Sequence, residues 1–353
     1  MNYTSAPKKM LNMCILDILK EHTDASHTLT QKEIADILQS QFEMTVDRKA
    51  IKRNLSELVN AGYPIDWEEI PRGGKDGESP VWTNFYLNRE FEDSELRLLI
   101  DSLLFSKHIP YSQCKSLIEK LEGLSNKYFK SKVKHISNLP ENLPGNKQLF
   151  LVIEILDEAI SRGKQVSFLY DEFGTDKRKH HKLNADGSPR QYVVNPYQMV
   201  ATNGRYYLIG NYNKYDNVSY YRLDRIAEIK LLDTPVKDKK LVAGMEHGLN
   251  LPAMMAEHLY MFGGPSVRAK FRAPIWLADQ IIDWFGLDVE FSKEPVANEK
   301  SPSEEVTLVS VRVNENAFFF WVLQYGVYVE VLEPKAIRNK IKAAIIKMDQ
   351  QYK

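Results

Sequence analysis

Cysteine and long apolar runs are scarce in this chain of 353 residues. Cys14 and Cys114 are its two cysteines, too few for a disulfide framework or a four-ligand zinc site, so a reducing compartment fits best. The longest apolar run, 317–323, is far shorter than the roughly 18 residues of a membrane span. No apolar stretch follows Lys8 and Lys9 as it would in a secretory signal. We therefore expect a cytoplasmic protein with no membrane partner.

Net charge and catalytic motifs are missing as well. Lys plus Arg and Asp plus Glu number 47 each, so binding of nucleic acid would need a local basic patch. The chain has no GxSxG sequence and no Ser-His-Asp order, and Gly73-Gly74-Lys75 lacks the P-loop spacing. His180 and His181 are adjacent in a basic loop, with no further ligand in register. We therefore expect no enzyme activity, no metal and no cofactor.

What is present is the composition of a globular protein, with 43% apolar, 27% charged and 11% aromatic residues, in a chain too long for one ordinary core. The first domain is predicted to span 1–90. Apolar residues at helical spacing predict three short helices there, the second capped by Thr30 and Glu33. Strands over 64–70 and 81–87 follow, around a Gly-rich turn. Together they predict three helices with a hairpin wing.

The third of these helices, which begins after Asp47, has one apolar and one cationic face. Ile51 and Leu55 share the apolar face, and four of the eight basic residues among the first 62 lie on this one helix. Such a helix can enter the major groove, where cations meet phosphates and Arg forks onto guanine. The alternative is an ordinary solvated basic face. The predicted contacts to double-stranded DNA are Arg48, Lys49, Lys52 and Arg53 on the helix and Arg72 and Lys75 in the turn of the wing.

Four further segments are separated by their periodicity. Residues 91–146 predict a helical connector that ends in a stretch rich in proline, and 147–235 predict a helix followed by short strands. Residues 236–265 read as a loose linker. The order of strands and helices over 266–353 predicts a ferredoxin-like split βαβ domain. The chain is therefore predicted to be an α+β multidomain protein.

The short strands of the middle segment predict a small β-barrel or a strongly bent sheet. The dipeptide Asn203-Gly204 is a strong hairpin signal, and the one long connection is a polar loop over 171–188. After the hairpin, Arg205 and Tyr207 are predicted to point to one face of their strand. Tyr206 and Leu208 are predicted to point to the other face, toward the core.

Arginines and tyrosines of this segment are predicted to form one ligand site. The predicted contacts are Tyr170, Arg190, Tyr192, Arg205, Tyr207, Arg222 and Arg225. Guanidinium groups fork onto phosphate or carboxylate, and tyrosines offer stacking faces and hydroxyls. The set suits a nucleotide, an oligonucleotide or another anionic effector. The alternative is that Arg222 and Arg225 only pair with acidic neighbours such as Asp224 and that the tyrosines are core.

Two parts of the chain resemble a known family. The stretch 47–65, which contains Ala50-Ile51-Lys52-Arg53-Asn54-Leu55, resembles the recognition helix of DeoR-like winged helix-turn-helix regulators. Asn195-Pro196, Asn203-Gly204-Arg205-Tyr206-Tyr207-Leu208 and Tyr221-Arg222-Leu223-Asp224-Arg225-Ile226 resemble the signature of the WYL-domain family. The resemblance implies an N-terminal winged helix-turn-helix, a central SH3/Sm-like WYL barrel that senses an effector, and a C-terminal WCX extension.

Two residues depart from the family pattern. Tyr206 stands where the family usually has tryptophan, an aromatic replacement that should leave packing intact. Asn54 stands where an aspartate commonly follows the arginine of the recognition helix, which removes one partner of a helix-stabilising ion pair but not the DNA role.

The combined prediction is a ligand-responsive, DNA-binding transcriptional regulator. We expect a homodimer, because one recognition helix reads too few base pairs for useful specificity. Two alternatives remain open at this point. One is an enzyme acting on nucleotides with an appended DNA-binding head, and the other is a regulator whose middle domain binds single-stranded nucleic acid.

Overall fold

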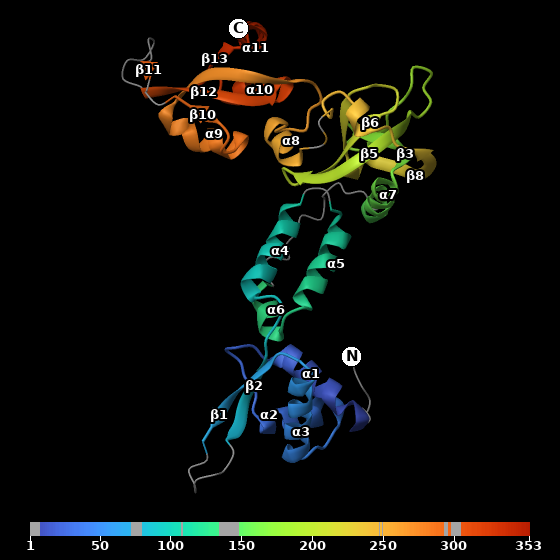
Figure 1. Cartoon of the computed structure of the whole chain (residues 1–353), viewed down its shortest axis with the longest axis vertical. Helices are drawn as coiled ribbons and strands as arrows, with labels where there is room; N and C mark the ends of the chain where they lie inside the picture. The colour runs from blue at the N-terminus through green and yellow to red at the C-terminus, as the bar shows by residue number, and fades with distance from the viewer. Residues whose placement is uncertain are drawn as a thin grey trace. The chain divides into compact units, whose positions relative to one another are not determined.

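The computed structural model describes residues 8–71, 80–106, 109–133, 148–246, 248, 250–292, 296–297 and 305–353. The chain divides into two compact units, Met1–Pro144 and Gly145–Lys353 (Figure 1). Among the described helices, none combines the length and the apolar character needed to cross a bilayer.

The first unit begins with a small helical head and its hairpin. Its elements are α1 (Leu11–His22), α2 (Gln31–Phe42), α3 (Arg48–Asn60), β1 (Ile65–Ile70), β2 (Val81–Leu87), α4 (Asp93–Phe105), α5 (Tyr111–Glu122) and α6 (Lys127–Val133). Thr30 and Glu33 form the predicted capping box at the start of α2, and Asp47 accepts the Ala50 N–H at 2.7 Å at the start of α3. The predicted helices and the two strands are therefore present.

The head has its own apolar core, built from the inner faces of α1 to α3 and closed by the hairpin. Ile15, Leu19, Ile34, Leu38 and Ile51 are all fully buried in it. Helices α4 and α5 lie side by side after the head (Figure 1).

Asn126 joins the head to α6. Its side-chain Oδ1 accepts the N–H groups of Tyr128 at 3.0 Å and Phe129 at 2.9 Å, which caps the start of α6. Its Nδ2 donates to the carbonyl of Thr23 at 3.1 Å and to Asp24 Oδ2 at 2.6 Å, in the turn that follows α1. Because Asn126 is fully buried, breaking these bonds would leave polar groups without water. We call this set of contacts the Asn126 joint.

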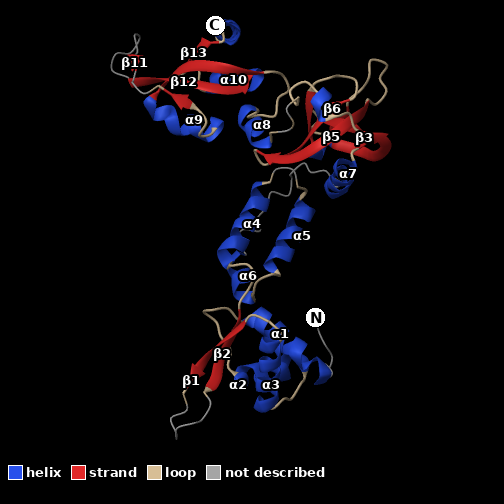
Figure 2. Ribbon diagram, in the orientation of Figure 1, coloured by secondary structure: helices blue, strands red, loops and turns tan. Residues whose placement is uncertain are grey.

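The second unit begins with a helix and a bent antiparallel sheet, seen in red in Figure 2. Its first elements are α7 (Leu149–Arg162), β3 (Lys164–Phe173), β4 (Lys179–His181), β5 (Gln191–Thr202), β6 (Arg205–Tyr212), β7 (Val218–Arg222), the 3-10 turn η3 (Leu223–Arg225) and β8 (Ile226–Pro235). The strand order is β4-β3-β5-β6-β7, with β8 on the other edge of β3. Helix α7 packs against β3, β5 and β8.

The sheet contains one strand that was not predicted, a register shift at Pro196 and a close backbone approach at Gly210. The loop predicted over 171–188 contains β4, which pairs with the end of β3 and was missed because its residues do not alternate between apolar and polar. Strand β5 runs through Pro196, where a register shift accommodates the residue that lacks an N–H. Gly210 pairs with Pro196, and a Cβ there would come within 2.8 Å of the Asn195 carbonyl oxygen.

Buried amides hold the loops of the sheet in place. Asn195 Oδ1 accepts Gln165 Nε2 at 2.8 Å and the Lys237 N–H at 2.9 Å, while its Nδ2 donates to Asn211 Oδ1 at 2.9 Å. Asn211 in turn donates to the carbonyl of Asn217 at 2.9 Å. Asn195 and Asn211 are both fully buried. The Asn195-Pro196 part of the signature therefore has a structural role.

The segment predicted as a loose linker contains helix α8 (Leu251–Glu257). Met254 and Met255 of this helix pack with Met261 against Ile209 and the ring of Tyr207 in β6. The prediction missed the helix because it has only seven residues and glycines on both sides. The sheet is therefore covered by α7 on one face and by α8 on the other.

The C-terminal part has the predicted order of elements. They are β9 (Ser266–Pro274), α9 (Ala278–Phe285), β10 (Glu290–Phe291), β11 (Val296–Ala297), β12 (Glu305–Asn314), α10 (Glu315–Gln324), β13 (Glu330–Glu333) and α11 (Lys335–Gln351). The strands are antiparallel in the order β10-β12-β9-β13 (Figure 2). Phe271, Phe285, Phe318 and Trp321 fill the core, so the first and last residues of the aromatic run 318–321 of α10 are interior, whereas Phe320 is exposed.

Candidate functional site

Helix α3 separates its apolar and cationic faces as its sequence predicts. Ile51 and Leu55 are fully buried in the core of the head, whereas the cationic residues of the opposite face are exposed to solvent. The exposed cations are Arg48, Lys49, Lys52 and Arg53. The structure therefore brings the four predicted cations of the helix together on one solvated surface.

These cations have weak partners within the head. Arg53 Nε lies 3.9 Å from Glu57 Oε1, and both side chains are largely exposed. Lys52 Nζ lies 5.7 Å from the ring centre of Trp82. Asn54 is buried and donates to the Ala50 carbonyl at 2.8 Å, so the amide is satisfied within its own helix. Exposed pairs of this kind contribute little energy, so the helix surface remains available to an external anion.

The described part of the wing adds aromatic and acidic groups, not cations. Trp67 of β1 and Trp82 of β2 stack with ring centres 4.3 Å apart, next to Lys52. Strand β1 also carries the carboxylates Asp66, Glu68 and Glu69. The predicted contacts Arg72 and Lys75 lie outside the described residues. Among the described groups, the positive charge of this surface is therefore concentrated on α3.

A second group of cations surrounds Asp224 in η3. Arg222 donates to both carboxylate oxygens of Asp224, at 3.0 Å from Nε and 2.6 Å from Nη2, and Asp224 is fully buried. Pairing with Asp224 was the predicted alternative to a ligand-binding role for Arg222, and the structure contains this pair. A bidentate pair with a buried carboxylate is a structural contact in its own right.

Lys179 and Arg225 complete this group, which we call the Asp224 cluster. Lys179 Nζ donates to the Asp224 carbonyl at 2.7 Å, and burial lowers its pKa with a further contribution from Arg222 and Arg225. The Arg225 Nε is buried and has no hydrogen-bond partner among the described residues. Arg222 therefore pairs with the carboxylate of Asp224, Lys179 with its main-chain carbonyl, and the neighbouring Arg225 has a buried donor without a partner among the described residues.

The tyrosines Tyr170 and Tyr207 lie beside the Asp224 cluster. The Tyr170 hydroxyl accepts the backbone N–H of Arg222 at 3.0 Å. Burial raises the pKa of both phenols, and the charge of Arg225 opposes that rise in each. Both rings therefore remain protonated at neutral pH and present a hydroxyl next to the guanidinium of Arg225.

The other predicted ligand contacts lie in different surroundings. The Arg190 guanidinium stacks on the rings of Tyr192 and Tyr212, 4.9 and 5.5 Å from their centres. Tyr192 is buried in a cluster of aromatic rings with Tyr221. Arg205 begins β6, two residues before Tyr207. The structure thus groups Tyr170, Tyr207, Arg222 and Arg225, and the ring of Tyr192, whose centre lies 6.1 Å from that of Tyr170, connects this group to Arg190.

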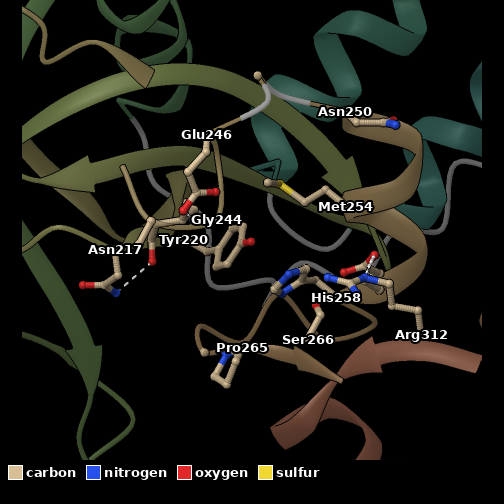
Figure 3. A pocket seen from close by; sticks show the side chains of 15 residues that line it. Asn217, Tyr220, Gly244, Glu246, Asn250, Met254, His258, Pro265, Ser266 and Arg312 are labelled. Carbon is tan, nitrogen blue, oxygen red and sulfur yellow. Dashed lines mark hydrogen bonds and ion pairs between the residues drawn. The ribbon is translucent and has the colours of Figure 1, made fainter. Parts of the chain in front are cut away.

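A cavity of about 670 Å³ lies between β7, α8 and the strands β9 and β12 (Figure 3). Tyr220, Glu246, Glu257, His258 and Arg312 line it. None of these residues was predicted as a site, because they come from three distant segments and match no motif. Among the described residues, no group of three or more His, Cys, Asp or Glu side chains could hold a metal ion.

Comparison with known proteins matches two protein-family models. Residues 152–231 match the WYL domain, and residues 265–348 match the WCX domain. These matches cover the bent sheet with α7 and the C-terminal α+β part. The chain is therefore a protein with a WYL domain followed by a WCX domain.

One similar protein spans nearly the whole chain. This is the uncharacterized HTH-type transcriptional regulator YobV of Bacillus subtilis (strain 168), 23% identical over 367 residues that cover 98% of each chain. The chain therefore carries a WYL and a WCX domain and is distantly similar over its whole length to a helix-turn-helix transcriptional regulator.

Two solved structures align with the full length of this chain, but at low TM-scores. Proteasome accessory factor B/C (PafBC) of Arthrobacter aurescens shares 15% identity at a TM-score of 0.29, and the present chain spans 50% of that chain. A CRISPR Cas-related protein shares 12% identity at a TM-score of 0.37, over 88% of that chain.

Proposed function

We propose that the chain binds double-stranded DNA through α3, with the head acting as a winged helix-turn-helix. The observation that carries this proposal is the solvated row of Arg48, Lys49, Lys52 and Arg53 on the outer face of the helix. The acidic residues of β1 would repel phosphates, so α3 has the leading role among the described groups. The full-length similarity of the chain to an HTH-type transcriptional regulator, at 23% identity, supports the same role.

We propose further that the WYL domain, an SH3/Sm-like barrel, senses an anionic effector at the Asp224 cluster. Lys179, Arg222 and Arg225 carry three positive charges, and Asp224 neutralises one of them. The buried Arg225 Nε without a partner marks the point where a phosphate or carboxylate oxygen would gain most. Arg205 and Tyr207 lie on the same face of β6. The Arg190 stack would contact only the far end of a longer ligand.

We propose a homodimer whose WCX domain, with its ferredoxin-like order of elements, closes the effector site or joins the two copies. Two recognition helices on half-sites about one helical turn apart would double the number of base pairs read. Sedimentation equilibrium of the full chain, with and without a DNA duplex, measures the number of copies directly.

The DNA-binding proposal is tested with the full chain and its double variant Lys49→Ala/Arg53→Ala. A duplex selected from a random library by the parent protein serves as the operator. We expect the double variant to lose at least tenfold in affinity for it, because both cations lie on the surface that would face DNA. The matched control is Lys20→Ala, which removes an exposed cation from α1. Equal losses in the control and the double variant would contradict the proposal.

The effector proposal is tested by titrating the full chain with AMP and, separately, with a short single-stranded oligodeoxynucleotide. Both offer phosphate, and the two titrations distinguish a nucleotide effector from a nucleic acid. We expect Arg225→Ala to weaken whichever ligand binds to the parent protein, while the Arg190→Ala variant retains the binding of AMP. Unchanged affinity in Arg225→Ala would contradict the placement of the site.

A further inference from the structure

Helix α4 exposes apolar side chains on the side that points away from its buried residues. Leu96 and Ile100 are buried, whereas Leu98 and Phe105 are 69% and 68% exposed. The polar side of the helix is a narrow row at positions i, i+3 and i+7, formed by Ser94, Arg97 and Asp101. A helix that is apolar over most of its circumference packs against other elements on more than one side. Within the described residues, only the side with Leu96 and Ile100 is covered completely.

Helix α5 continues this apolar surface across a groove of about 490 Å³ between the two helices (Figure 1). Three leucines of α5 line the groove in one row at positions i, i+4 and i+7, namely Leu117, Leu121 and Leu124. Ser102 of α4 also lines the groove, and it lies one helical turn from both Leu98 and Phe105. The groove and the exposed side of α4 are therefore continuous, and we call this surface the α4–α5 face.

The α4–α5 face carries little charge. Among the described residues that line the groove, Lys120 is the one charged side chain, and it is exposed. Arg97 and Asp101 pair with each other at 3.0 Å on the polar row of α4. A surface that pairs with its own copy across a twofold axis brings like residues close together, so uncompensated charge at its centre would oppose the pairing. The composition of the α4–α5 face is therefore compatible with pairing to itself.

The size of the α4–α5 face matches that of a dimer interface. Leu99 and Leu124 are 40% and 51% exposed, in addition to Leu98 and Phe105. Two copies that covered this face on each other would bury roughly 1,000 Å² in total, which is about the lower limit for a specific interface. A small ligand in the groove would leave Leu98 and Phe105 exposed, because they lie outside the residues that line it. A second pair of helices would cover both the groove and the exposed side of α4.

We propose that the α4–α5 face pairs with the same face of a second copy, so that two pairs of helices form a four-helix bundle around a twofold axis. This inference rests on the homodimer proposed above and names the surface that joins the copies. Leu98 and Phe105 pack between the helices of the two copies. Lys120 lies at the rim of the interface, where water solvates its charge.

Sedimentation equilibrium of the full chain and its double variant Leu98→Glu/Phe105→Glu tests the proposal. We expect the parent protein to be a dimer and the dissociation constant of the dimer to rise at least about a hundredfold in the variant, because each copy would bury two carboxylates without partners. Both side chains are exposed within one chain, so the variant should keep its fold. An unchanged far-UV circular dichroism spectrum of the variant checks this point.

The matched control is Ile346→Glu/Met348→Glu, which makes the same kind of exchange at two exposed apolar residues of α11 and should leave the dissociation constant unchanged. A monomeric parent protein would overturn the proposed homodimer and this inference with it. A dimeric parent whose dissociation constant is the same in the Leu98→Glu/Phe105→Glu variant would overturn this inference alone, because another surface would then join the copies. Equal weakening by the control and the variant would also overturn it.

A cross-link locates the interface directly. Cys14 and Cys114 are buried, so a cysteine introduced on the surface is the one that reacts. Ser102 lies in the middle of the α4–α5 face, and we expect the Ser102→Cys variant to give a covalent dimer with a short bismaleimide. Ser112→Cys places the thiol at an exposed serine on the other side of α5 and should give none. Equal yields of covalent dimer in the two variants would contradict the pairing of the α4–α5 faces.

Discussion

Positive charge gathers in two regions of this molecule, α3 and the Asp224 cluster, and the two regions hold it in different ways. On α3 the cations are solvated, and among the described residues their ion pair, Arg53 with Glu57, is 3.9 Å long and exposed. In the Asp224 cluster the cations are partly buried, and Arg222 pairs with a carboxylate that is 1% exposed. A solvated cation is therefore available to an external anion, whereas a cation paired with a buried acid contributes to the structure.

The largest expected effect is the loss of stability in Arg222→Ala. The substitution leaves Asp224 buried without its bidentate partner, which costs on the order of 3–5 kcal/mol of unfolding free energy. Chemical denaturation of the full chain, followed by tyrosine and tryptophan fluorescence, measures this cost. Arg225→Ala, which leaves no buried acid unpaired, should change it by less than about 1 kcal/mol. Equal free energies of unfolding for the two variants would contradict the prediction that Arg222 stabilises the fold and Arg225 does not.

The next effect concerns affinity in the Asp224 cluster. Arg225→Ala should weaken an anionic ligand by roughly 1.5–3 kcal/mol, or about ten- to a hundredfold, because the lost bond is charge-assisted. The Arg225→Lys variant keeps the charge but not the fork, so its affinity should lie between those of the parent and the alanine variant. Calorimetric titration with AMP or the oligodeoxynucleotide measures both. If the Arg225→Lys variant binds the ligand as tightly as the parent protein, the affinity depends on the positive charge and not on bidentate hydrogen bonds.

Two cations in the first half of α3, Lys49 and Arg53, should differ in how their loss changes the salt dependence of DNA binding. Arg53→Ala is expected to cost about 1–3 kcal/mol at the selected operator and less on random DNA if Arg53 contacts a base. Lys49→Ala should weaken both complexes alike and lower the salt slope by about one if Lys49 contacts a phosphate. Fluorescence anisotropy over a range of salt concentrations checks both. Identical behaviour of the two variants would mean that α3 reads no sequence.

The smallest expected effect lies at the N-terminus of α3. Asp47→Ala removes the acceptor of the Ala50 N–H and should destabilise the head by about 1 kcal/mol. Glu57→Gln, which breaks only the long exposed contact with Arg53, should change stability by less than about 0.5 kcal/mol. Urea denaturation followed by the fluorescence of Trp67 and Trp82 reports on the head. A larger effect for Glu57→Gln would show that the ion pair is stronger than its geometry indicates.

The elements with a strong local signal were predictable from the chain itself. The capping box at Thr30, the cap at Asp47 and the period-two strands after Asn203-Gly204 all depend on neighbours a few residues away. The faces of α3 followed from helical spacing for the same reason. These predictions agree with the structure because the physical causes are local.

The features that the prediction missed depend on contacts between distant segments. Helix α8 is stabilised by packing of its methionines on β6, which no local pattern encodes. Lys179 looked like part of a solvated loop until β4 placed it beside Asp224. The cavity lined by Tyr220, His258 and Arg312 likewise exists only after three segments have met. The WYL domain was recognised from short motifs and the WCX domain was implied by that resemblance, whereas the contacts inside the two domains were not predicted.

The Asn126 joint has a mechanical consequence for the head. One fully buried amide caps α6 and also binds the turn after α1, so the head cannot swivel on α6 without breaking hydrogen bonds that are shielded from water. The joint therefore couples the start of α6 rigidly to the head. If α3 binds DNA in a dimer as proposed, a rotation of α6 would turn α3 with it and would change the spacing of the two heads along the DNA.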